Sequence, residues 1–176
     1  MELKEAQEEV RRGFIGGGPG VIVSGLIWSA AALAEAERGV AFGFAVLFVG
    51  GMLIYPASLL VARFVFRRVA PQRGNGLTPI ALESTLAMIG GLFAAFLFLP
   101  HEPALVLPLA ALAVGAHYFV FRTLYGEVLF LVLGMVISVL ALNATFEWVA
   151  VPVSLAWCVA VVEILFGAIL TARNRV

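Results

Sequence analysis

The chain has 176 residues, of which 62% are hydrophobic and 12% are charged, and its formal net charge is zero. A globular domain is roughly 45–50% apolar and about 25% charged, so the composition excludes an ordinary soluble fold and favours one that uses lipid as its apolar solvent. The neutral balance excludes the basic surface that nucleic-acid binding needs, and the single cysteine, Cys158, excludes both an internal disulfide and a cysteine metal site.

Residues 1–13 form a charged segment that is unlike a secretory signal peptide, which begins with a short basic region and an apolar core. The apolar positions recur at helical spacing, and the glutamates precede the closing pair Arg11 and Arg12. That order of charges suits a helix dipole. We therefore predict an amphipathic helix on the cytoplasmic membrane surface, with a solvated, frayed terminus as the alternative.

Six apolar stretches are long enough to cross a membrane, which takes about 20 residues as a helix. They are Phe14–Ala34, Gly39–Phe66, Pro79–Leu99, Ala104–Leu124, Glu127–Leu142 and Trp148–Thr171. The second is long enough to tilt, and Tyr55-Pro56 predicts a kink within it. The fifth is the shortest. Residues 14–176 are therefore predicted to form one all-α transmembrane domain, a bundle of six helices.

The placement of lysine and arginine predicts the orientation of these helices. With the N-terminus inside, one of the 11 basic residues, Arg38, falls outside. The inside set is Lys4, Arg11, Arg12, Arg63, Arg67, Arg68, Arg73, Arg122, Arg173 and Arg175. A model with five spans would place Arg122 or the C-terminal arginines on the wrong side. The bias therefore predicts an even number of spans with both termini in the cytoplasm.

Three ionisable side chains within the spans are candidate functional groups, because such residues are costly in a membrane. Glu83, His117 and Glu163 each lie on the small-residue stripe of their helix, where membrane helices approach closely. We therefore expect all three to point into the bundle. Arg63 and Tyr55 fall at comparable depth, as do Ser58, Ser84, Thr85 and Tyr118. Together these side chains predict a polar cluster that opens toward the cytoplasm.

A structural role is the alternative for each of these candidates. Glu83 and Arg63 would then form an ion pair at the membrane border, and His117 would be bonded to a neighbouring helix. For Glu163, a structural hydrogen bond competes with a working proton site.

The run Gly16-Gly17-Gly18-Pro19-Gly20 at the start of the first span is a candidate anion site made of backbone groups. Glycine permits unusual backbone angles, and the helix that follows presents free N–H groups. Broken helices in transporters use the same arrangement. The alternative is a glycine-rich kink that lets helices pack tightly.

The segment Phe14-Ile-Gly-Gly-Gly-Pro-Gly-Val, followed by Ser24-Gly-Leu-Ile-Trp28 and Tyr55-Pro56, resembles a family of small bacterial multi-pass membrane proteins of unknown function. The resemblance implies a location in the bacterial inner (cytoplasmic) membrane. It implies no activity, cofactor or catalytic residue.

The favoured hypothesis is a small transporter or channel with a cytoplasm-facing cavity, in which Glu163 carries a proton or binds a cation. Arg63 and the backbone of Gly16–Gly20 would attract an anionic group. The alternatives are an accessory or scaffold protein and, less favoured, an enzyme that acts on a lipid. We expect no cofactor, no metal and no nucleic acid. The expected partners are membrane lipid, further copies of the chain in a homo-oligomer, and a small ion or metabolite.

Overall fold

The computed structural model describes residues 2–69, 71 and 74–175, and all regular structure in them is helical. The α-helices are α1 (Leu3–Phe14), α2 (Gly18–Arg38), α3 (Val40–Gly51), α4 (Ile54–Leu60), α5 (Thr78–Leu97), α6 (Val106–Tyr125), α7 (Leu129–Phe146) and α8 (Leu155–Asn174). Short turns of tighter or wider helix are η1 (Ile15–Gly17), η2 (Val61–Val65) and η3 (Pro103–Leu105).

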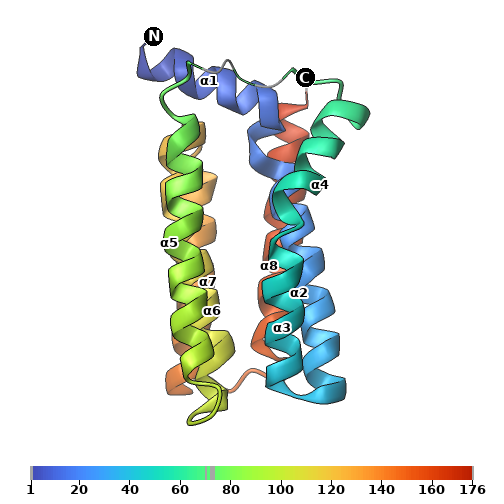
Figure 1. Cartoon of the computed structure of the whole chain (residues 1–176), viewed down its shortest axis with the longest axis vertical. Coiled ribbons are helices and arrows are strands. Elements are labelled where there is room, and N and C mark those ends of the chain that lie inside the picture. The colour runs from blue at the N-terminus through green and yellow to red at the C-terminus, as the bar shows by residue number, and fades with distance from the viewer. Residues whose placement is uncertain (1, 70, 72–73, 176) are drawn as a thin grey trace.

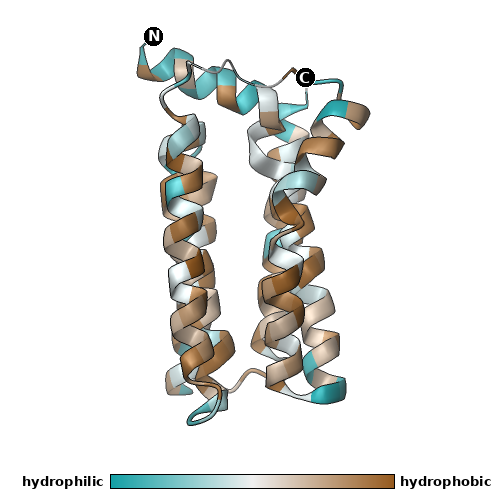
Figure 2. Cartoon of the chain, in the orientation of Figure 1, coloured by the Kyte–Doolittle hydropathy of each residue, from teal (hydrophilic) through white to brown (hydrophobic). Residues whose placement is uncertain are grey.

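The helices are those of a membrane protein. In the described part of the chain, five are long and apolar enough to cross a bilayer, and there are six if the bent pair α3 and α4–η2 counts as one span. Both termini lie at the same end of the bundle (Figure 1). Hydrophilic residues gather at the two ends and apolar ones cover the length between them (Figure 2).

The second predicted span is broken where Tyr55-Pro56 predicts a kink. α3 ends at Gly51 and α4 begins at Ile54, and the two halves are bent by 44°. Pro56 lies in the first turn of α4, where its missing N–H leaves no helical hydrogen bond unmade. The break carries the end of this span away from α5 in the upper part of the bundle (Figure 1).

α1 is amphipathic and lies across the end of the bundle rather than within a span (Figure 1). Ala6 and Val10 are buried beneath it. Left-handed backbone angles at Ile15, Gly16 and Gly17 separate it from α2. The first span therefore begins at Gly18 rather than at Phe14, because these three residues turn the chain from the surface into the bundle.

The last two spans differ from their predicted limits. α7 reaches Phe146, beyond the predicted end at Leu142. Its 18 residues are long and apolar enough to cross a membrane, so the shortest predicted stretch is a candidate span. α8 begins at Leu155 rather than Trp148, because residues 147–154 form the connection between the two helices. In that connection the side chain of Asn143 binds both the N–H and the carbonyl of Val149.

Neighbouring helices follow one another around the bundle in the order α3, α2, α8, α7, α6 and α5. α2 and α8 pack most extensively, because glycines bring their backbones into contact. A Cβ atom at Gly25 would be 2.9 Å from the carbonyl oxygen of Ala160, and one at Gly167 would be 2.7 Å from the nitrogen of Ile22. This α2–α8 seam is where the principal candidate residue lies.

Candidate functional site

Glu163 has no exposed surface and lies in the middle of α8. Ala156, Ala160 and Gly167 on the same face are also buried, so the small-residue stripe points into the bundle as predicted. A carboxyl in such a place is costly unless it is bonded or neutral. Its two oxygens therefore decide what the site can do.

One oxygen of Glu163 is bonded and the other is free. The hydroxyl of Tyr118 on α6 donates to Oε1 at 2.8 Å, and the side chain of Ser24 on α2 interacts with both groups. Oε2 has no hydrogen-bond partner among the described residues. Three helices thus meet at one carboxyl that keeps an unused acceptor.

His117 precedes Tyr118 and points to a different helix. Its Nδ1 lies 2.7 Å from the hydroxyl of Ser84 on α5, which is buried. Consecutive residues of α6 therefore reach α8 through Tyr118 and α5 through His117. The bond to a neighbouring helix agrees with the structural alternative for His117.

The expected position of Glu83 is wrong. Its side chain is exposed on the outer face of α5, as are Ala87, Gly90 and Ala94 of the same stripe. The bundle contacts α5 on another face, where Ser84, Leu92 and Ala95 are buried. The small-residue stripe misled the prediction, because small residues on α5 also cover a surface that the single chain leaves open.

The expected ion pair between Glu83 and Arg63 is absent from the described residues, in which the acidic partners of arginine are Glu8 and Glu127. Arg63 is exposed on η2. Tyr55 is exposed as well, and its ring lies 6.3 Å from that of Phe14 near the end of α1. Of the five predicted side chains, the fold thus brings only Glu163 and His117 close, through Tyr118.

The glycine run is filled by side chains of the chain itself. A Cβ at Gly16 would meet the amide of Asn174, one at Gly17 would meet the rings of Tyr125 and Phe130, and one at Gly18 would meet Thr171. Gly16, Gly17 and Gly18 are buried, whereas Gly20 is partly exposed beside Ser58. This filling supports the interpretation as a packing kink over an anion site.

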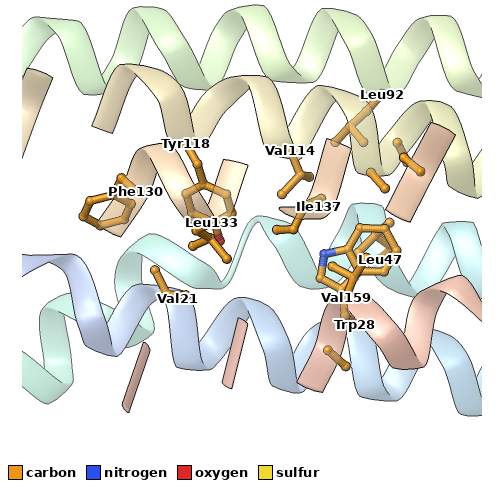
Figure 3. Close-up of a cluster of buried hydrophobic side chains, with 14 of the residues drawn as sticks. Val21, Trp28, Leu47, Leu92, Val114, Tyr118, Phe130, Leu133, Ile137 and Val159 are labelled. Carbon is orange, nitrogen blue, oxygen red and sulfur yellow. The ribbon is translucent and has the colours of Figure 1, made fainter. Parts of the chain in front are cut away.

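An aromatic cluster lies between Glu163 and the end of the bundle that carries the termini. Phe130 of α7 is at its centre, with ring centroids 6.0 Å from Tyr118, 5.5 Å from Phe121 and 5.2 Å from Tyr125. Figure 3 shows Tyr118 and Phe130 side by side in the buried core. The cluster fills the core between Tyr118, the partner of the carboxyl, and that end of the bundle.

Two surface hollows lie away from these residues, at opposite ends of the bundle. One, of about 510 Å³, is lined by α1 and by Arg67, Arg68 and Val69. The other, of about 370 Å³, is lined by the connection between α7 and α8. Among the described residues, no three histidine, cysteine, aspartate or glutamate side chains are grouped to hold a metal ion.

The polar residues that complete the site are Tyr118, Ser24 and Ser84. The sequence placed Tyr118 and Ser84 at the depth of the predicted polar cluster, but neither they nor Ser24 were selected as site residues. Hydroxyl residues are common in spans, so their type carried little signal. Their neighbours did carry one, because Tyr118 follows His117, Ser84 follows Glu83, and Ser24 precedes Gly25 on a close-packed face.

Comparison with protein families matches nearly the whole chain. The family described as "Family of unknown function (DUF7010)" matches residues 3–173, from the start of α1 to near the end of α8. No curated protein and no solved structure matches the chain significantly.

Proposed function

Because this chain belongs to DUF7010, a family whose function is unknown, we propose its function from its own residues: it is a small proton-linked transporter in which Glu163 binds the proton. In this proposal it lies in the cytoplasmic membrane with both termini inside, as the distribution of lysine and arginine favours.

The free Oε2 of Glu163 is the observation that carries the proposal. Buried polar atoms in native proteins nearly always have a partner, and a proton is one that can complete an unpaired carboxyl oxygen. Here Tyr118 fixes Oε1 at 2.8 Å and leaves Oε2 able to take and release a proton. Ionisable groups of this kind within spans commonly mark proton pathways.

His117 is the second residue of the proposal. Through Ser84 it joins α5 to the same helix that Tyr118 joins to α8. A change in the charge of Glu163 would alter the bond to Tyr118, and α6 would pass that change to α5. This arrangement links proton binding to the packing of the two sides of the bundle.

The test uses the purified full chain in lipid vesicles that enclose a pH-sensitive dye. Panels of inorganic cations, organic amines and carboxylates are added outside, and proton movement is recorded for each. We expect a flux that depends on one class of solute and is lost in Glu163→Gln, while Glu102→Gln, which changes an exposed loop carboxyl, keeps it. A flux equal to the parent's in Glu163→Gln would overturn the proton role.

A second candidate function, as a helix-packing accessory protein, is favoured by the open face of α5. Only 17% of the residues in its most apolar window are buried, against 28–56% in the other unbroken spans. Glu83 and the small residues Ala87, Gly90 and Ala94 lie on this open face, and small residues are typical of helix interfaces in membranes.

This candidate predicts self-association through α5. In a Cys158→Ser background, Ala87→Cys should form a disulfide-linked dimer in native membranes, and Gly90→Leu should prevent it. Cysteine at exposed Val139 on α7 is the matched control. Equal crosslinking at the two positions would contradict an α5 interface.

A further inference from the structure

Two buried polar atoms on facing turns of α2 and α8 lack hydrogen-bond partners among the described residues. They are Nε1 of Trp28 and Oε2 of Glu163. Both side chains have no exposed surface. Native proteins rarely leave such atoms unpaired, and an ordered internal water supplies the bond where no protein group does.

The two residues lie about one helical turn apart along the α2–α8 seam. Ser24 faces Glu163, and Trp28 follows Ser24 by four residues on α2. On α8, Val159 precedes Glu163 by four residues, and the contact of Gly25 with Ala160 sets an antiparallel register that places Trp28 near the turn of Val159. One turn of helix advances about 5.4 Å, so the backbone positions of Trp28 and Glu163 are offset along the seam by roughly that distance.

The two side chains lean toward each other. In an α-helix each Cα–Cβ bond tilts toward the N-terminus of the helix, and α2 and α8 run in opposite directions (Figure 1). Trp28 therefore leans toward the turn of Ser24, and Glu163 leans toward the turn of Val159. In Figure 3 the indole nitrogen is on the edge of the ring nearer Tyr118, the residue whose hydroxyl donates to the carboxyl of Glu163.

We propose that one internal water molecule bridges Nε1 of Trp28 and Oε2 of Glu163, so that Trp28 is a positioning residue of the proton site. Such a bridge spans up to roughly 5.5 Å, twice a hydrogen-bond length, a gap that suits two side chains that start one turn apart and lean toward each other. The indole donates to the water and the water donates to the carboxylate. When Oε2 binds a proton, the carboxyl becomes a donor and the water turns to accept from it.

Few other groups can titrate beside this site. On α6, Tyr118 faces Glu163 directly, and the titratable His117 beside it points to Ser84 of α5. α2 contributes the uncharged Ser24 and Trp28, and α7, which packs against α6 and α8, carries no ionisable side chain. A change with pH at Trp28 that Glu163→Gln removes therefore reports Glu163. The inference rests on the proposed role of Glu163 as the proton-binding group.

The test makes Trp28 the sole tryptophan. Trp148→Phe and Trp157→Phe are combined in the full chain, which is placed in lipid vesicles, and tryptophan emission is recorded from mildly acidic to mildly alkaline pH. We expect a single step in the emission maximum that is lost in Glu163→Gln. A flat profile in the parent, or a step that survives unchanged in Glu163→Gln, would overturn the bridge.

A second variant protects the test if Glu163→Gln does not fold. Tyr118→Phe removes the hydroxyl that donates to Oε1, so it should move the midpoint of the step, whereas Glu102→Gln should leave the midpoint in place. An unmoved midpoint in Tyr118→Phe would contradict the assignment. Failure of the bridge can be told apart from failure of the proposed function. If solute-driven proton flux needs Glu163 but Trp28 emission does not change with pH, the bridge is refuted and the transporter proposal stands.

Discussion

Tyr118 and Glu163, which are 45 residues apart in the chain, are joined at the centre of the bundle by a hydrogen bond of 2.8 Å. Neither side chain is accessible, with 4% and 0% of their surfaces exposed. The bond therefore ties α6 to α8 in a place closed to bulk solvent. Its strength contributes to stability and, in our proposal, to proton binding.

We predict that Tyr118→Phe destabilises the protein by on the order of 1–3 kcal/mol, because it removes the hydroxyl that donates to Oε1 of a fully buried carboxyl. Chemical unfolding in detergent micelles measures the change. Tyr55→Phe is the matched control, since that side chain is exposed, and we expect an effect within about 0.5 kcal/mol. Equal losses in the two variants would refute a special role for the buried hydroxyl.

The α2–α8 seam predicts a second difference between two variants of the same type. In Gly167→Ala, the new Cβ would be 2.7 Å from the nitrogen of Ile22 and 3.0 Å from the carbonyl oxygen of Gly18. Neither backbone atom can move cheaply, so we expect a loss of about 1–3 kcal/mol. Gly90→Ala meets nothing within 4 Å and should be neutral or slightly stabilising. Thermal unfolding of the two variants checks the contrast.

Asn75 is predicted to hold α1 on the end of the bundle. Its buried amide donates to the carbonyl of Ala6 at 3.0 Å and to the carboxylate of Glu9 at 2.7 Å, and it accepts from the N–H of Leu77 at 2.9 Å. Asn75→Ala should raise amide hydrogen exchange in residues 3–14 while the spans keep their protection.

The control for this prediction is Asn143→Ala at the other end of the molecule. Asn143 also makes two side-chain bonds to the backbone, both to Val149, but it is remote from α1. We expect faster exchange only in the connection between α7 and α8. If Asn75→Ala left exchange in residues 3–14 unchanged, other contacts would have to hold α1.

The orientation in the membrane predicts opposite labelling at the two ends of α5–α6. Glu102 lies in the connection at the end away from the termini, and Arg122 lies near the end that carries them (Figure 1). In a Cys158→Ser background, a membrane-impermeant maleimide should label Glu102→Cys in intact cells and Arg122→Cys only after permeabilisation. The reverse pattern would show that both termini lie outside.

Patterns that many residues repeat predicted more of this fold than single residues did. The apolar helices, the amphipathic helix α1 and the burial of Glu163 followed from such patterns, and the kink followed from the dipeptide Tyr55-Pro56. The prediction that Glu83 points into the bundle was wrong, because a face of small residues does not show whether the helix that packs on it belongs to the same chain. Arg73, part of the predicted inside set, lies outside the described residues.

The sequence by itself determined that this is an all-helical membrane protein, because the cost of exposing apolar surface and unpaired backbone groups depends on composition and run length alone. Only the tertiary structure decided which polar groups meet. Tyr118, Ser24 and Trp28 reach the seam around Glu163 because α2 and α8 pack at glycine contacts, and the order of helices around the bundle then sets every other neighbour. That order depends on packing between segments far apart in the chain, which local pattern does not encode.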